Sequence, residues 1–326
     1  MRTDEGHGAR NTGERLLLVA NPRAGGGRAG RERPAIEAAV ARAFEHAEVV
    51  WTEAAGQASQ IVRERVRPGD IVAALGGDGT CNEVVNGLMG DEGPLEPTAI
   101  FTSIPFGTGG DLVRSLEIPR TLRDALWVAA TGTTVHVDVG RVTWSSGYRR
   151  WFINVAGAGA NAEVCVRVNQ SDKRWGGTVT FLGAILATVR AFQPLTTQWR
   201  WSGPDGVGEV ELPTLAAFVA NAHYCGAGLW VGRDGSMADG AFDVTLIPPL
   251  TLGRAVLSLP HTRTGHLDQI PGAIRFRADT IDMVGALPIE TDGEPRGPGP
   301  ARFTLAHRAL QVRGAWRSPP ISFSDL

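Results

Sequence analysis

The sequence predicts an α/β N-terminal domain with a doubly wound parallel sheet, followed by a mostly antiparallel β-sandwich domain. Between residues 15 and 142, short apolar runs alternate with segments of helical apolar spacing, which is typical of parallel strands joined by helices. Beyond residue 142, strand-like runs dominate and favour a sandwich or barrel of antiparallel strands. We therefore expect domains at 15–142 and 143–300, with 301–326 returning as strands toward the first domain.

The composition is that of an ordinary globular protein. Charged residues make up 20% and hydrophobic residues 43% of the 326 residues, which suits about two domains, each with its own core. The formal net charge is -2, so no general attraction to nucleic acid is expected. The three cysteines are widely spaced; this argues against a disulfide framework or a zinc site and fits a reducing, cytoplasmic compartment.

The N-terminus carries no targeting signal that we can recognise. Residues 1–14 are polar and charged, so they predict a disordered tail rather than a signal peptide. No apolar run in the chain reaches about 18 residues, so the sequence predicts no transmembrane span.

A glycine loop after the apolar run 70–75 is the best candidate for a phosphate site. It consists of Gly76, Gly77, Asp78, Gly79 and Thr80. Helical spacing begins directly after it, and a helix N-terminus with bare backbone N–H groups suits phosphate. A carboxylate at Asp78 would repel phosphate unless a cation lay between them, so the loop predicts Mg²⁺. The alternative is a tight structural turn with a solvated aspartate.

Two further glycine loops follow strand-like runs. The first follows the run 16–20 and contains Asn21, Pro22, Gly25 and Gly27. The second follows the run 98–104 and contains Gly107, Thr108, Gly110 and Asp111. Loops at the ends of parallel strands form the ligand edge of an open α/β sheet. The alternatives are a flexible turn for the first loop and a helix N-cap role for Asp111, which is compatible with a water-mediated contact to Mg²⁺.

These loops carry a resemblance to a known family. The run GGDGTCNEVVNGL at 76–88 resembles the nucleotide loop of the diacylglycerol kinase catalytic family, which includes bacterial diacylglycerol, sphingosine and ceramide kinases. Its GGDG core is shared with NAD kinases and is similar to that of phosphofructokinases, so the first domain should be NAD-kinase/phosphofructokinase-like. The loop at 21–27 resembles the family's NPxxGxG motif. The loop at 105–114 resembles P-x-G-T-x-N-D-x-A-R, with Gly110 in the place of the usual asparagine.

The resemblance implies ATP and Mg²⁺ as cofactors and names the residues that contact them. The implied nucleotide-binding residues are Asn21, Pro22, Gly25, Gly27, Thr52, Gly76, Gly77, Asp78, Gly79, Thr80, Glu83, Gly107, Thr108 and Asp111. Near Thr52 the family often has Gly-His-Ala, and here Gln57 replaces the histidine.

The second domain contains two further acidic turns. Asp292-Gly293-Glu294 resembles the family's terminal DGE. The resemblance implies that Asp292 takes the proton from the lipid hydroxyl and that Glu294 joins Asp78 and Asp111 in a partly water-mediated Mg²⁺ network. Asp239 matches a family aspartate that binds a structural Mg²⁺, with Ser236 and Ala241 beside it. The alternatives are an exposed hairpin turn and a plain surface loop.

One helix is predicted within the second domain. Its apolar face is formed by Val179, Phe181, Leu182, Ile185, Leu186, Val189 and Phe192, and Lys173, Arg174 and Trp175 precede it. Such a face packs on the core in most soluble proteins. The alternative is a surface that meets the bilayer or the lipid tail.

The sequence therefore favours an ATP- and Mg²⁺-dependent lipid kinase. It would transfer the γ-phosphoryl group to the hydroxyl of a diacylglycerol-like acceptor in lipid metabolism, as a cytoplasmic protein that visits the membrane surface peripherally. A small-molecule kinase of the NAD-kinase type and a non-catalytic nucleotide- or lipid-binding relative are the alternatives. The sequence is compatible with a homodimer.

Overall fold

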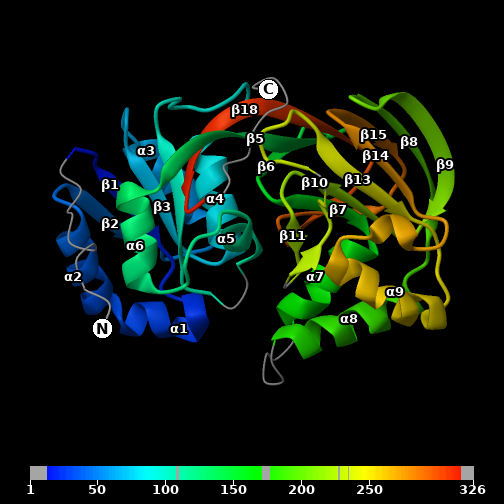
Figure 1. Ribbon diagram of the computed structural model, residues 1–326, viewed down its shortest axis with the longest axis horizontal. Helices are drawn as coiled ribbons and strands as arrows, with labels where there is room; N and C mark the ends of the chain where they lie inside the picture. The colour runs from blue at the N-terminus through cyan, green and yellow to red at the C-terminus, as the bar shows by residue number, and fades with distance from the viewer. Residues whose placement is uncertain (1–12, 108–109, 171–176, 227, 234, 317–326) are drawn as a thin grey trace, which may run out of the picture. The chain divides into compact units, whose positions relative to one another are not determined.

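The computed structural model describes residues 13–107, 110–170, 177–226, 228–233 and 235–316 (Figure 1). The chain divides into two units. Among the described residues, the first consists of 13–137 and 308–316, and the second of Asp138–His307. The predicted domain boundary at residue 142 lies within strand β5 (Thr133–Trp144).

The first unit is built on parallel strands in the order β2-β1-β3-β4-β18. Their bounds are β1 Leu16–Ala20, β2 Ala47–Trp51, β3 Ile71–Gly76, β4 Ile100–Pro105 and β18 Ala301–Gly314, of which the C-terminal end pairs with β4. Every residue of β1 and β3 is buried. Continuous apolar strands are typical of a parallel sheet that is covered on both faces.

Helices connect these strands and cover the sheet. Their bounds are α1 Ala24–Arg31, α2 Arg33–Ala43, α3 Gln57–Arg65, α4 Asp78–Leu88, α5 Asp111–Ser115 and α6 Leu122–Thr131. Helix α3 packs against α4, and α2 packs against α6. Because crossover connections are right-handed, a strand order with β1 between β2 and β3 places these two pairs on opposite faces. The predicted doubly wound α/β fold is confirmed.

The second unit contains two sheets that enclose one core, as the predicted sandwich requires. One sheet is antiparallel and has the order β14-β13-β10-β7-β16-β17: Ile274–Ala278, Phe242–Ile247, Ala216–Ala220, Val155–Gly159, Pro288–Thr291 and Glu294–Pro298. The other contains β6 Arg149–Phe152, β8 Leu195–Gly203, β9 Gly206–Thr214, β15 Thr280–Val284 and parts of β5 and β18. A short pair, β11 (Tyr224–Cys225) and β12 (Leu229–Trp230), lies apart. Phe152 and Phe242 stack in the core with ring centroids 5.5 Å apart.

The second unit has more helix than the sequence predicts. The described residues form α7 (Ala160–Gln170), α8 (Gly177–Ala191), α9 (Leu252–Thr264) and the short 3₁₀ turn η2 (Leu267–Gln269). Only α8 was predicted. Its C-terminal end packs on the sandwich, because Val189 contacts the core and Phe192, just beyond the helix, is buried in it. Lys173, Arg174 and Trp175 lie outside the described residues.

The ends of the described chain meet in the first unit. The Arg313 guanidinium donates hydrogen bonds of 2.9 and 2.8 Å to the two carboxylate oxygens of Glu14. Glu14 is thus part of the fold, whereas residues 1–12 of the predicted tail lie outside the described residues. Within the described segments, no helix combines the length and the hydropathy that crossing a membrane needs.

Candidate active-site elements

The loops at 21–27 and 76–80 meet where the connections of the first unit's sheet change direction. Strands β1 and β3 are neighbours, and Ala20 pairs with Leu75 at their carboxyl ends. The chain leaves β1 toward β2 and leaves β3 toward β4, on the opposite side. Ligands of open α/β sheets bind at such a switch point. Hydrogen bonds join the loops, from Asn21 N to Leu75 O at 2.9 Å and from Asn21 Nδ2 to Thr80 Oγ1 at 3.3 Å.

Glycines bring bare backbone to this edge. Gly25, Gly26 and Gly27 have φ values of 61°, 67° and 80°, a left-handed conformation that glycine adopts at little cost. A Cβ on Gly25 would lie 2.8 Å from the Phe106 carbonyl oxygen, whereas a Cβ built on Gly26 or Gly77 would have no described atom within 4 Å other than those of its chain neighbours. Gly26 and Gly77 therefore border open space. The Arg28 guanidinium carbon lies 4.6 Å from the centroid of the Phe106 ring and adds a cation nearby.

The loop after β4 joins this group. Phe106 N donates to Gly76 O at 3.0 Å. A Cβ on Gly107 would lie 3.1 Å from the Gly77 Cα, so only glycine lets the two loops approach this closely. The structure thus places three of the predicted loops together, while Thr108 lies outside the described residues.

The Asp78 carboxylate connects α4 to the start of α5. It accepts hydrogen bonds from three backbone N–H groups, those of Gly110 at 3.0 Å, Asp111 at 3.4 Å and Leu112 at 3.3 Å. These are N–H groups that a helix N-terminus leaves without intrahelical partners. Asp78 therefore caps α5 from another helix. Asp111, at the same place, is buried, and its carboxylate accepts a bond of 3.4 Å from Arg114.

Glu83 and Thr52 make contacts that hold the fold. The Glu83 carboxylate accepts hydrogen bonds from Gly56 N at 2.8 Å and Ala58 N at 3.2 Å, at the start of α3. Thr52 is buried, and its N–H donates to Ala20 O at 2.9 Å. Beside β2, a hollow of about 480 Å³ includes Pro22, Trp51 and Thr52 in its wall. Pro22 and Thr52 therefore share a hollow, whereas the Glu83 carboxylate serves as a helix cap.

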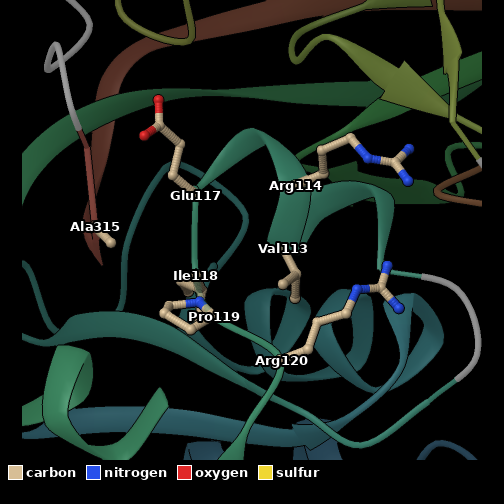
Figure 2. Close-up of a pocket in the computed structure, with 7 residues that line it drawn as sticks. All are labelled: Val113, Arg114, Glu117, Ile118, Pro119, Arg120 and Ala315. Carbon is tan, nitrogen blue, oxygen red and sulfur yellow. The ribbon is translucent and has the colours of Figure 1, made fainter. Parts of the chain in front are cut away.

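A second hollow, of about 540 Å³, lies beside α5 and is drawn in Figure 2. The side chains of Arg114 and Arg120 extend to the same side of it, and that of Glu117 extends away from them (Figure 2). Gly110 has a φ of 102°, and a Cβ there would lie 3.4 Å from Arg120 Nη2. The Arg120 guanidinium thus borders the place where the asparagine of related sequences would begin.

The Asp292 turn of the second unit is a hairpin in which Asp292 is buried and Gly293 is exposed. Asp292 and Gly293 join β16 to β17 with φ values of 50° and 84°, as a two-residue type I′ turn requires. Asp292 is 8% exposed, which differs from the exposed turn considered as the alternative. Its carboxylate accepts backbone hydrogen bonds from Ile153 at 3.1 Å, Asn154 at 2.9 Å and Val155 at 3.1 Å.

Two buried groups beside this turn were not predicted. Glu290 Oε2 accepts a hydrogen bond of 2.8 Å from Gly293 N, and burial raises the pKa of the Glu290 carboxyl to about 8. Glu290 lies on β16, two residues before Asp292 of the turn. Asn154 is also buried, and its Oδ1 has no hydrogen-bond partner among the described residues. A buried acceptor without a donor is costly, so this oxygen suits a bound hydroxyl or water.

Comparison with known proteins identifies the family. Residues 15–142 match the diacylglycerol kinase catalytic domain, and residues 154–314 match the YegS C-terminal NAD kinase beta sandwich-like domain. A protein of Xanthomonas oryzae pv. oryzae named "Probable lipid kinase YegS-like" is 30% identical over 254 residues, which cover 76% of this chain and 79% of that protein. The chain belongs to the diacylglycerol kinase catalytic-domain family.

Other members of this family support the assignment over most of the chain. A diacylglycerol kinase of Mycobacterium tuberculosis is 27% identical over 306 residues, covering 91% of this chain and 94% of that protein. The crystal structure of a diacylglycerol kinase from Bacillus anthracis is 20% identical, has a TM-score of 0.67 and covers 92% of this chain and 97% of that chain, which shows a shared fold. The predicted family and enzyme class, a lipid kinase, are confirmed.

For this family member, the two predicted metal sites differ in their donor chemistry. The described residues contain no cluster of three or more His, Cys, Asp or Glu side chains that could hold a metal. The Asp78 carboxylate nonetheless reaches the backbone of Asp111, because Asp111 N donates to Asp78 Oδ2. Mg²⁺ commonly uses one or two carboxylates and completes its shell with water and substrate phosphates. The pair in the first unit therefore fits Mg²⁺ bound together with a nucleotide.

The residues at Asp239 do not fit a structural Mg²⁺. The Asp239 carboxylate forms an ion pair of 2.5 Å with Arg277 and accepts hydrogen bonds from Ser236 N at 3.0 Å and Ala241 N at 3.3 Å. Ser236 and Ala241 contribute N–H donors, as Gly110, Asp111 and Leu112 do at Asp78, so what sets the Asp239 site apart is the full positive charge of Arg277. The positive charge beside Asp239 comes from the Arg277 guanidinium.

Proposed function

We propose that this chain transfers the γ-phosphoryl group of ATP to the hydroxyl of a diacylglycerol-like lipid, with Mg²⁺ as the metal. The observation that carries this proposal is the meeting of the glycine loops at 21–27 and 76–80 at the switch point of the parallel sheet. The acceptor class comes from the names of related proteins, which include diacylglycerol kinases.

The first unit would bind the nucleotide phosphates. The N-terminus of α4, with Gly77 at its start and open space beside it, offers backbone N–H groups and a positive helix dipole. Arg28 adds positive charge at the neighbouring loop. Asp78 and Asp111 would hold Mg²⁺, which when bound offsets the negative charge of the phosphates.

The second unit would activate the acceptor hydroxyl through Asp292. Three backbone N–H groups fix the orientation of this carboxylate, and a carboxylate is a group that acts as a general base toward an alcohol. The Asn154 side-chain oxygen, which has no partner among the described residues, offers an acceptor at the same turn. Glu294, the first residue of β17, remains assigned to the Mg²⁺ network on the resemblance alone.

The proposed acceptor determines that the protein must reach a membrane. A diacylglycerol-like lipid resides in a bilayer, and the described residues form no membrane-spanning helix. We therefore propose peripheral contact of the protein with the membrane surface.

The test is label transfer from γ-labelled ATP into separate acceptors, namely diacylglycerol, ceramide, sphingosine and NAD. Asp292→Asn is compared with Asp282→Asn, a matched substitution of a half-exposed aspartate on β15 that pairs with Arg302. We expect labelled lipid from the wild type and from Asp282→Asn, and a rate lower by at least about a hundredfold for Asp292→Asn. Label in NAD alone would favour a small-molecule kinase, and ATP binding with no transfer would favour a non-catalytic relative.

A further inference from the structure

Helix α9 of the second unit buries two small side chains and exposes three of its four leucines and valines, while the fourth, Leu259, is half-buried. Ala255 and Ser258 are 7% and 5% exposed. Leu252, Val256 and Leu257 are 42%, 45% and 75% exposed, and we call these three residues the apolar face of α9. A surface helix of a globular protein normally shows the opposite arrangement, with its leucines and valines against the core. Packing within this unit therefore does not explain why large apolar residues occupy these exposed positions.

This exposure is concentrated in one place. Leu252 and Val256 are one helical turn apart, and Val256 adjoins Leu257. The other large apolar side chains that are exposed among the described residues, such as Leu95, Tyr148 and Val207, lie on separate elements. Single exposed apolar residues are normal on protein surfaces, whereas a cluster marks an interaction site.

The charged side chains on α9 itself are all positive, and the exposed acid Asp268 lies beyond its C-terminal end on η2. Helix α9 contains no acidic residue, and its charged residues, Arg254 and Arg263, are both exposed. Helix α8 packs against α9 (Figure 1), has no acidic residue either, and ends with the exposed Arg190. Apolar side chains combined with arginines and without acids are typical of a helix that lies in the interface of a membrane with anionic lipids.

We propose that the apolar face of α9 binds the surface of an anionic phospholipid bilayer. Leu252, Val256 and Leu257 enter the headgroup region, and Arg254 and Arg263 pair with lipid phosphates. This inference names the membrane-contacting surface of the proposed lipid kinase, so its biological meaning rests on that function. The binding itself needs no catalysis and is measured separately.

A second copy of the chain is a poorer occupant of this surface. A two-fold symmetric dimer brings the same patch of both copies together, so Arg254 and Arg263 would face their own copies. Stable dimers also need about 800 Å² of buried surface from each partner, which three partly exposed side chains do not supply. A bilayer rich in anionic lipid offers an apolar environment to the three apolar side chains and phosphate groups to the two arginines.

The test is sedimentation of the full chain with vesicles of phosphatidylcholine alone and of phosphatidylcholine mixed with phosphatidylglycerol. The variant V256E/L257E places two acids on the apolar face. Its control is V207E, which introduces the same acid at the 88% exposed Val207 of β9. A second variant, R254Q/R263Q, removes the positive charge and keeps the apolar side chains. Circular dichroism checks that each variant is folded.

We expect the wild type and V207E to bind the mixed vesicles, and V256E/L257E to bind them at least about tenfold more weakly. R254Q/R263Q should lose about tenfold on mixed vesicles and little on neutral ones. Equal binding of wild type and V256E/L257E would overturn the proposal. The proposal would also be overturned if light scattering showed a wild-type dimer that is absent in V256E/L257E, and if the wild type did not bind vesicles.

A kinase assay separates this proposal from the proposed function. If both are correct, V256E/L257E phosphorylates a detergent-dispersed acceptor at the wild-type rate and an acceptor in mixed vesicles more slowly. If the wild type binds vesicles through α9 but labels no lipid, the proposed acceptor is wrong and the surface assignment stands. If it labels dispersed lipid but V256E/L257E acts normally on vesicles, the surface assignment is wrong.

Discussion

At the residue scale, Glu290 links the stability of the second unit to pH. The pKa of its carboxyl is raised to about 8: burial raises it most, the hydrogen bond from Gly293 N opposes this, and the neighbouring Asp292 carboxylate adds to the rise. Because the pKa is higher in the folded than in the unfolded state, the folded state holds this proton more tightly. The stabilisation is complete below pH 4.5, the ordinary pKa of a glutamate side chain, and is lost as the pH rises toward about 8.

We therefore expect Glu290→Gln to gain stability over the wild type as the pH rises from about 5 to about 8, by up to about 1.4 kcal/mol per pH unit. Glutamine keeps an oxygen for the Gly293 N–H and cannot ionise. Urea unfolding across this range measures the difference. Glu211→Gln, at an exposed carboxyl on β9, is the control and should follow the wild type. Parallel stability curves for Glu290→Gln and the wild type would show that Glu290 ionises normally.

Also at the residue scale, Arg277 supplies the cation beside Asp239. The ion pair and the two backbone N–H donors leave the Asp239 carboxylate in a setting that suits a guanidinium. We expect the melting temperature of the nucleotide-free wild type to be the same in EDTA and in Mg²⁺. Arg277→Met should destabilise the protein by about 3 kcal/mol, because it leaves a buried carboxylate unpaired. A wild-type melting temperature that falls in EDTA would instead support a structural metal.

At the element scale, strands with strong local patterns were predictable and two helices were not. Strands β1 and β3 are apolar throughout, and burial on both faces is the reason. Helix α7 contains Val164, Val166 and Val168 at alternate positions, a spacing that gives no helical signal. Helix α9 exposes Leu252, Val256 and Leu257 and includes Pro260, so its sequence lacks the inward stripe of large apolar residues that identifies a helix.

In the candidate site, too, features that depend on neighbouring residues were predictable, and contacts between residues distant in the sequence were not. The glycine loops were predictable because each directly follows a strand. The partners of the acidic residues were not, because they lie far away in the sequence. Asp78 caps a helix that begins at residue 111, and Asp292 accepts hydrogen bonds from residues 153–155. Such contacts depend on how strands are ordered in the sheets, which the sequence pattern leaves open.

At the scale of the whole molecule, the C-terminal end of β18 completes the first unit. Residues Gln311 and Val312 pair with β4, and Thr102 Oγ1 donates to Arg313 O at 2.9 Å. The Arg313 guanidinium, 8% exposed as a residue, also donates to Ala129 O at 3.0 Å and to Thr134 Oγ1 at 2.9 Å. Through these contacts and its bonds to Glu14, the Arg313 side chain connects the segment before β1 with α6, β5 and β18.

Replacing Arg313 should therefore weaken the unit that carries the nucleotide loops. We expect Arg313→Ala to lower the free energy of unfolding by about 3 to 5 kcal/mol, because it leaves Glu14 and buried acceptors without their donor. Arg302→Ala is the matched control on the same strand. Arg302 forms two hydrogen bonds to Asp282, of 2.6 and 2.8 Å, but its side chain is 58% exposed, so its loss should cost less than about 1 kcal/mol. Urea unfolding followed by tryptophan fluorescence measures both. Equal losses for the two variants would mean that burial does not distinguish these ion pairs and that Arg313 does not tie the chain ends to the first unit.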